Sequence, residues 1–138
     1  MNKNREIKFR AWDSHHKMWL KTGIAIQLDG SVYDMCSESP DDNVIIQQYT
    51  EIKDKTGKEI YEGDIVKIWH DSYTIWHDSY TNRIRDYELA VVIWGWNEWA
   101  LKISHANPIK RYTIDFPVDE EYTEIIGNIC EHPHMVRI

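Results

Sequence analysis

The segment from Cys130 to His134 brings one thiol and two imidazoles within five residues. Thiolate and imidazole are ligand types that zinc prefers. A structural zinc site usually draws a second pair of ligands from elsewhere in the chain, yet this sequence contains no CxxC or HxxxH spacing. We therefore expect no bound metal and no other cofactor.

Two His-Asp pairs, His70-Asp71 and His77-Asp78, resemble half of a catalytic dyad. Neighbouring residues on an extended chain point to opposite faces, however, and a triad also needs an activated Ser or Cys and an oxyanion site. Nothing in the sequence marks either one. There is also no Walker loop, no GxGxxG and no HExxH motif. We expect a protein that is not an enzyme.

The seven tryptophans are the most informative side chains. Large rings either fill the core of a small β protein or form a surface that binds proteins, bases or sugars. A net charge of −7 favours a protein partner over nucleic acid. The binding candidates are aromatic residues in two groups, namely Trp69, Tyr73 and Trp76, and then Trp94, Trp96 and Trp99, where Trp94 and Trp96 share a face and Trp99 meets them across a hairpin.

Short strands must position these side chains. Apolar residues alternate with a period of two, so Ile7, Phe9 and Ala11 are expected on the one buried face of the first strand. Asp29-Gly30 and Asp54–Gly57 are hairpin turn signals, and Gly127 indicates a bulge or a close approach. Asp119–Glu121 is expected to form either a short helical turn or a charged loop. The predicted fold is all-β, built from small antiparallel sheets, with strands at residues 7–11, 18–20, 24–28, 32–33, 44–46, 65–69, 87–96, 99–103, 112–116 and 122–129. The run at 87–96 is expected to be a central strand buried on both faces.

A perfect tandem duplication follows Lys67, because Ile68–Thr74 is repeated as Ile75–Thr81. The repeat is either a two-fold binding motif or a tolerated duplication. In one continuous strand a shift of seven residues places Trp69 and Trp76 on opposite faces, which a buried sheet does not accommodate. Added loop length costs little, so we predict a loop insertion at about residues 68–86, outside the sheets.

Composition limits the class of protein. The chain has 138 residues, 42% hydrophobic and 28% charged, which is typical of one globular domain or two small ones. The segment Met1–Glu6 has no apolar signal core, and no run approaches the ~20 apolar residues of a membrane span. With Cys36 and Cys130 as the two cysteines, we expect free thiols, a cytoplasmic location and no membrane partner.

Three blocks of the sequence resemble the signature of the YopX family, which occurs in bacteriophages and prophages. They are Ile7–Asp13, Gln48–Val66 and Ile125–Ile129. The resemblance implies a β-rich fold ending in a small SH3-like barrel, a tendency to form homo-oligomers, and no established function. Glu51 stands where the family usually has glycine, so a turn at this position would lose its permissive residue.

The residues and the resemblance together predict an organisation and a role. We expect residues 1–50 to form an N-terminal β-hairpin region and residues 51–138 an SH3-like barrel. The expected function is that of a phage or prophage accessory protein, in the host cytoplasm, that associates with itself and binds another protein of phage or host. The alternative is a β-barrel that binds nucleic acid.

Overall fold

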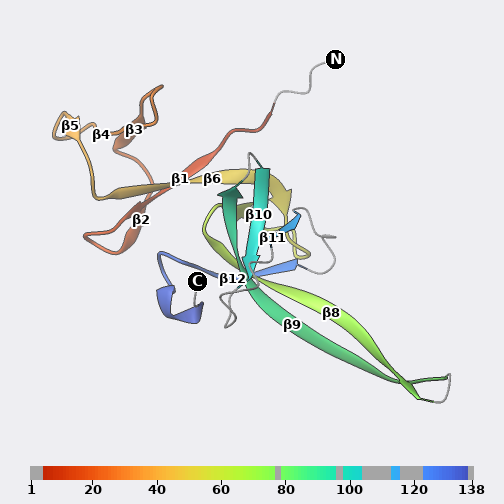
Figure 1. Ribbon diagram of the computed structural model, residues 1–138. Helices are drawn as coiled ribbons and strands as arrows, with labels where there is room; N and C mark the ends of the chain where they lie inside the picture. Colours follow the sequence, from red (N-terminus) through yellow and green to blue (C-terminus); the bar gives the residue numbers. More distant parts are fainter. Residues whose placement is uncertain (1–4, 77–78, 96–97, 104–112, 116–122, 137–138) are drawn as a thin grey trace. The chain divides into compact units, whose positions relative to one another are not determined.

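Antiparallel β-strands are nearly all of the regular secondary structure among the described residues (Figure 1). The computed structural model describes residues 5–76, 79–95, 98–103, 113–115 and 123–136. Among these residues the one helical element is the 3-10 turn η2 (Pro133–Met135). The all-β prediction is confirmed, while the helical turn expected at Asp119–Glu121 lies outside the described residues.

The chain divides into two compact units, Met1–Tyr49 and Thr50–Ile138. In the first unit β1 pairs with β2 and β6, and β3, β4 and β5 form a second sheet. The hairpin predicted at Asp29-Gly30 is present, with Gly30 at a φ of +88°. The strands of this unit are β1 (Phe9–Asp13), β2 (Met18–Leu20), β3 (Ile24–Ile26), β4 (Val32–Asp34), β5 (Ser39–Pro40) and β6 (Val44–Lys53), which continues into the second unit.

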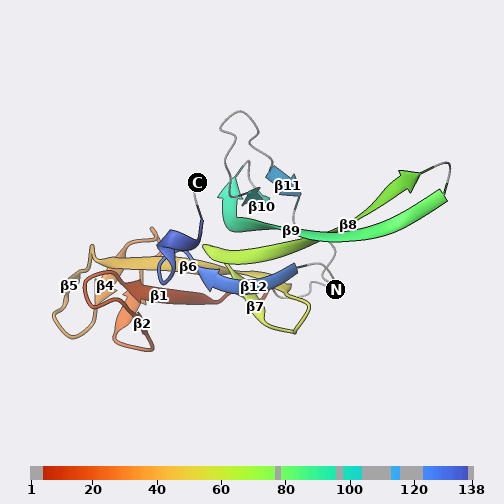
Figure 2. The ribbon, with the colours of Figure 1, turned by 90° about the horizontal axis from the view of Figure 1, so that it is seen from below.

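A five-stranded sheet of order β11-β10-β9-β8-β12 forms most of the second unit. Its strands are β8 (Asp64–Trp76), β9 (Ser79–Gly95), β10 (Glu98–Ile103), β11 (Thr113–Asp115) and β12 (Thr123–Asn128), and the short β7 (Glu59–Tyr61) is the neighbour of β6. Figure 2 shows β8 and β9 side by side over most of their length, and they pair from Ile65↔Val91 to Trp76↔Ser79. The predicted central strand is confirmed in its position, because β9 lies between β8 and β10. Its burial on both faces is confirmed at Ala90, Val91 and Val92 but not at Tyr87 and Trp94, which are exposed.

Side chains pack on both faces of this sheet. Alternate residues of β9 point to opposite faces, so Ala90 and Val92 join one cluster and Val91 joins the other. The first cluster contains Ile60, Val66, Ile68, Ala90, Val92 and Leu101, and the second contains Ile65, Val91 and Val136. This double burial explains the continuous apolar sequence of the central strand.

The buried face predicted for the first strand is partly wrong. Ile7 and Phe9 were expected to be buried, but they are 61% and 45% exposed. Trp12, on the opposite face, is buried and packs edge-on against the Trp19 ring, with the centroids 5.0 Å apart. Phe9 borders an open cavity, described below, which explains its exposure.

The Asp54–Gly57 turn is confirmed, and the structure gives its carboxylate a wider role. Asp54 is 4% exposed. Its Oδ1 accepts hydrogen bonds from Thr56 N, Thr56 Oγ1 and Lys58 N, and its Oδ2 accepts one from Ile125 N of β12 at 3.0 Å. Burial raises the pKa of Asp54, but these hydrogen bonds outweigh it and hold the pKa below its ordinary value. The turn is thereby joined to a strand distant in sequence.

A second buried carboxylate holds the next turn. Asp64 is 1% exposed, and its Oδ2 accepts the Tyr61 N–H at 2.8 Å. Its Oδ1 accepts Asn128 Nδ2 at 3.0 Å, and Gly63 N donates to Val92 O nearby. The carboxylate therefore connects the β7–β8 turn to the end of β12.

Gly127 lies both at a β-bulge and at a close approach of the chain, which are the two alternatives predicted for it. The ladder between β12 and β8 shifts register between Ile125 and Gly127, so a bulge is present. A Cβ atom on Gly127 would lie 2.9 Å from His132 Nδ1, which is closer than real contacts of this kind. Glycine lets the chain after β12 fold back against the bulge.

Glu51 adopts the left-handed conformation that favours glycine, with a φ of +69°. The chain remains in β6, and the Thr50 hydroxyl compensates for the irregular backbone. Thr50 Oγ1 donates to Ile60 O at 2.8 Å and accepts from Ile52 N at 3.2 Å. A glycine would adopt this backbone conformation without a Cβ clash.

Replacement of Glu51 should reveal this strain. We expect Glu51→Gly to be more stable than Glu51→Ala by about 1 kcal/mol, because both remove the side chain but only glycine relieves the Cβ clash at positive φ. Urea denaturation measures both variants. The same pair at Glu59, in β7, is the control and should show the opposite order, since glycine weakens a regular strand. If alanine is as stable as glycine at residue 51, the backbone there is unstrained.

The predicted loop at about residues 68–86 is wrong in its structure. Strand pairing between β8 and β9 continues from Ile65↔Val91 to Trp76↔Ser79, so the duplicated heptapeptides form a two-stranded ribbon. Figure 1 shows this ribbon extending away from β10 and β12. Backbone groups of the added residues pair with each other, which an irregular loop leaves to solvent.

A register shift in this ribbon follows from the length of the repeat. Twenty-one residues lie between the paired Lys67 and Leu89. When two of these residues form the connection between the strands, an odd number is left to pair, so one residue must remain without a partner in the ladder. That residue is Thr81, because Thr74 pairs with Asn82 and Ile75 with Tyr80.

Deletion of one copy should therefore leave the sheet intact. Without Ile75–Thr81 an even number of residues remains, and every pair from Ile68↔Glu88 to Tyr73↔Arg83 can form around a Thr74-Asn82 connection. We expect the unfolding free energy to change by less than about 1 kcal/mol, because the outer part of a two-stranded ribbon is marginally stable. NMR cross-strand contacts and urea denaturation test this, and deletion of Trp76–Thr81 is the control that should keep one unopposed residue. A loss above about 2 kcal/mol would contradict the expectation.

Candidate functional site

The structure places Trp69 and Trp94, one candidate from each group, on opposite faces of the five-stranded sheet. Trp69 lies opposite Tyr87 in the β8–β9 ladder, and Trp94 lies opposite Trp99 in the β9–β10 ladder. Because Tyr87 and Trp94 are an odd number of residues apart on β9, their side chains leave opposite faces. Trp69 and Trp94 therefore do not belong to one site.

One group is a cluster at the base of the ribbon, formed by Lys55, Lys67, Trp69 and Tyr87; we call it the ribbon-base cluster. The Trp69 and Tyr87 rings meet edge-on with centroids 5.3 Å apart. Lys67 Nζ lies 4.1 Å from the Tyr87 ring centroid and 4.9 Å from that of Trp69, and Lys55 Nζ lies 5.6 Å from Trp69. Cations so close to ring faces are attracted by the ring quadrupole. Tyr87, which the sequence reasoning missed, is 47% exposed.

The other group is the pair Trp94 and Trp99. Their rings meet edge-on at 5.0 Å, which confirms the contact predicted across the hairpin. Trp99 packs against the first core cluster, whereas Trp94 is 55% exposed. The pair thus joins a core residue to an exposed ring, a combination found at protein-binding surfaces.

The remaining candidates are placed only in part. Tyr73 and Trp76 lie in the outer part of β8, where they oppose Arg83 and Ser79 in the ladder. Trp96 lies outside the described residues. Their roles in binding stay predictions.

The histidines near the carboxyl end have local roles. His132 Nδ1 lies 3.3 Å from Asn128 N, which donates to it, and the His132 and His134 ring centroids are 6.5 Å apart. Across the parts of the chain that the structure describes, no three His, Cys, Asp or Glu residues gather as a metal site requires. The expectation that no metal binds stays a prediction.

Glu62 is a group that sequence reasoning missed. It lies half-buried in the turn between Tyr61 and Gly63, and burial raises the pKa of its carboxyl group above the ordinary value. Within the described residues it makes no hydrogen bond to a nucleophile or to another acid. It therefore forms no catalytic pair there.

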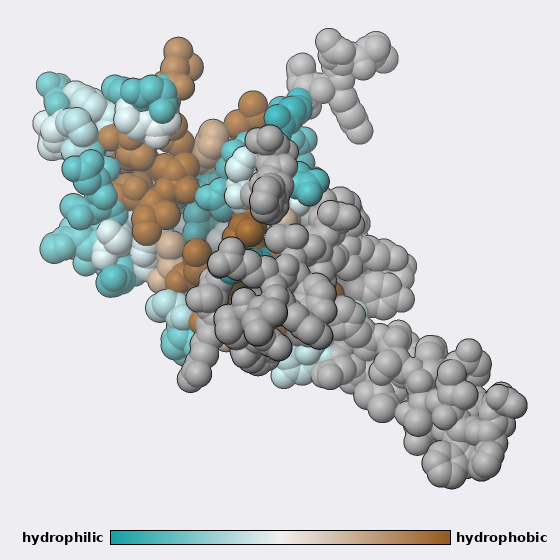
Figure 3. All heavy atoms as spheres, in the orientation of Figure 1, coloured by the Kyte–Doolittle hydropathy of each residue, from teal (hydrophilic) through white to brown (hydrophobic). Residues whose placement is uncertain are grey.

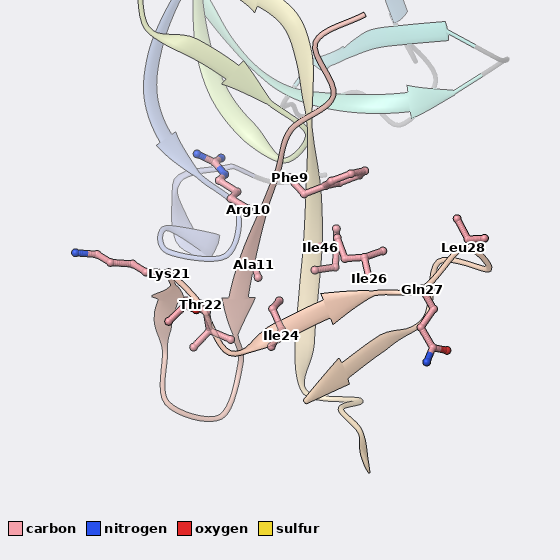
Figure 4. Close-up of a pocket in the computed structure, with 11 residues that line it drawn as sticks. Phe9, Arg10, Ala11, Lys21, Thr22, Ile24, Ile26, Gln27, Leu28 and Ile46 are labelled. Carbon is pink, nitrogen blue, oxygen red and sulfur yellow. The ribbon is translucent and has the colours of Figure 1, made fainter. Parts of the chain in front are cut away.

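The first unit contains a cavity of about 600 Å³, which the sequence reasoning also missed. It lies between β1, β6 and the β2–β3 connection, and Figure 3 shows hydrophobic residues gathered in this unit. In Figure 4, Phe9, Ile26 and Ile46 lie to one side of β1 while Arg10 and Lys21 point to the other. The volume is that of a typical ligand or peptide pocket. No sequence signal marks it, because it depends on where β2 ends.

Comparison with known proteins gives a family and a fold. The model of the YopX protein family matches residues 8–137. The crystal structure of protein EF1440 from Enterococcus faecalis is similar, with a TM-score of 0.61 and 20% sequence identity, covering 97% of this chain and 100% of that one. No curated protein sequence matches this chain. In the part of the chain that is described, no helix has the length and apolar character for crossing a membrane.

These matches agree with the three sequence blocks and with the β-rich structure. The signature carries two buried carboxylates, Asp54 and Asp64, that join its turns to β12. The family model extends over nearly the whole chain. The chain therefore belongs to the YopX family.

Proposed function

We propose that the protein is a non-enzymatic accessory protein of phage or prophage origin, acting in the host cytoplasm through self-association and protein binding. The observation that supports this most is the outer half of the β8–β9 ribbon. Beyond Trp69 and Tyr87 neither strand has another neighbour among the described strands, since β12 pairs with β8 only as far as Ile68 and β10 pairs with β9 only from Ala90 onward.

Open strand edges are surfaces on which other chains add strands. A two-stranded ribbon is marginally stable alone, so pairing with a second copy stabilises it. The ribbon-base cluster and the exposed Trp94 supply aromatic surface beside the sheet, of the kind enriched in protein interfaces. The open strand edges and the aromatic surface together support a role in protein binding rather than in catalysis.

Light scattering after size exclusion tests the self-association. Chains should elute at a multiple of the 16.5 kDa monomer mass. Replacing Asp71–Arg85 by Asn-Gly keeps the Trp69↔Tyr87 pair and gives a favoured two-residue turn, so this variant should elute as a folded monomer. A monomeric parent chain at micromolar concentration, or a variant that keeps the parent's mass, would contradict the proposal.

The alternative function, nucleic-acid binding, is favoured by the ribbon-base cluster, where two lysines lie beside two aromatic rings. Such clusters stack bases and contact phosphates. The net charge of −7 opposes it, and the SH3-like barrel on which it depends stays a prediction. Fluorescence anisotropy with a labelled single-stranded oligonucleotide at low salt distinguishes the two: binding that Lys67→Glu abolishes would favour this alternative.

A further inference from the structure

We propose that the first unit binds an extended segment of another protein, with alternating apolar and acidic residues, as an added strand on β1. This extends the protein-binding part of the proposed function to a second surface. It depends neither on self-association nor on the ribbon. Three features of the first unit support this proposal, namely the open backbone edge of β1, the apolar cavity beside that edge, and the cationic side chains on the opposite face of the sheet.

The open edge is at Phe9. Tyr49 N donates to Lys8 O, so Lys8, Arg10 and Trp12 direct their backbone groups toward β6. Phe9 and Ala11 consequently direct theirs to the other side, where Ala11 pairs with Leu20. β2 ends at Leu20, so no strand of the described chain continues beside Phe9. An added strand would occupy this place.

The cavity begins where β2 stops. Its lining includes Leu20, Lys21 and Thr22 from the end of β2 and Phe9, Arg10 and Ala11 from β1. An added strand would therefore enter existing space at the end of β2. Leu28, fully exposed on the β3–β4 turn, and Ile26 extend the apolar wall.

The two faces of the added strand would contact different kinds of side chain, apolar on one face and cationic on the other. Phe9, Ala11 and Ile46 share one face because Ala11 pairs with Ile46. Arg10 lies on the opposite face, where Nε donates to Gln47 Oε1 and the guanidinium stacks on Trp19 at 4.5 Å. Lys21 would continue the ladder opposite Arg10, and Figure 4 shows both side chains on that side. A strand of alternating residues thus places its apolar side chains in the cavity and the others beside two cations.

The charge of the residues around the cavity determines which kind of protein segment can bind there. Among the described residues, no Asp or Glu lines the cavity, although the whole chain carries −7. An acidic segment of a different protein complements the cations on one face and fills the apolar cavity with the other.

Fluorescence polarisation with labelled synthetic peptides tests the proposal. The probe is a blocked peptide of about seven residues that alternates Val and Glu, compared with one that alternates Val and Lys. We expect the acidic peptide to bind at least about tenfold more tightly. Methylating its alternate backbone amides on the edge facing β1 should abolish binding, since these amides make the strand pairing. No binding of the acidic peptide, equal binding of both peptides, or binding unaffected by methylation would overturn the proposal.

Matched variants locate the site. Leu28→Asp should weaken binding of the acidic peptide at least about tenfold, whereas Met35→Asp, an equally drastic change at another exposed residue of this unit, should leave it unchanged. Lys21→Glu should weaken binding and Lys17→Glu should not. Equal effects within either pair would contradict the site. Light scattering on the same variants separates this proposal from self-association, because their oligomer mass should match that of the parent chain.

Discussion

Asp54→Ala is expected to destabilise the protein by about 3 kcal/mol. The carboxylate accepts three hydrogen bonds within its own turn and one from Ile125 N, which lies in β12. Hydrogen bonds to charged groups contribute about 1.5–3 kcal/mol each, and a buried N–H left without an acceptor adds its own penalty. Urea denaturation at neutral pH measures the loss.

Asp29→Ala is the matched control. Asp29 also begins a hairpin turn, and it accepts hydrogen bonds from Ser31 N and Ser31 Oγ. Those contacts stay within one exposed turn. The control should therefore lose clearly less stability than Asp54→Ala. Equal losses would mean that the bond to Ile125 contributes nothing and that Asp54 only shapes its turn.

Acid should remove the contribution of Asp54. Its pKa is held below the ordinary value in the folded protein, so its charge stabilises the fold above the unfolded-state pKa of about 3.9. This contribution is lost as the pH falls through the folded-state pKa. We expect Asp54→Asn to be less stable than the parent chain at pH 7 and the two unfolding free energies to converge in acid. A difference that stays constant from neutral to acidic pH would exclude this linkage.

Local turn chemistry made the hairpins predictable. Asp29-Gly30 and Asp54–Gly57 each need a side chain that bonds nearby N–H groups and a residue that tolerates positive φ, and both requirements can be recognised in the sequence. The central strand was predictable for a similar reason, since burial on both faces explains the continuous apolar run at 89–93.

The β8–β9 ribbon and the cavity depend on which segments pair with each strand and on where each strand ends, and the sequence pattern does not specify either. His70-Asp71 is paired within β8, whereas the identical His77-Asp78 follows the last described residue of that strand. The first copy is distinguished by its pairing partners on β9, because His70 lies opposite Asp86 and Asp71 lies opposite Arg85. Likewise, Phe9 lies beside a cavity only because β2 ends at Leu20. Pairing partners and strand ends are tertiary properties, which periodicity does not encode.

Asp64→Ala is expected to cost about 3 kcal/mol, in a way that depends on Asn128. Asp64 is almost fully buried and accepts hydrogen bonds from Tyr61 N and Asn128 Nδ2, so alanine leaves two donors without this acceptor. In Asn128→Ala the side-chain donor is already gone. Asp64→Ala should therefore destabilise the Asn128→Ala background less than the parent chain, with a coupling energy of about 1–2 kcal/mol in a double-mutant cycle. Denaturation of the four proteins measures it, and strictly additive losses would show that Asp64 acts on the β7–β8 turn alone. A positive coupling would instead establish that two ends of the family signature, far apart in the chain, are held together by one carboxylate.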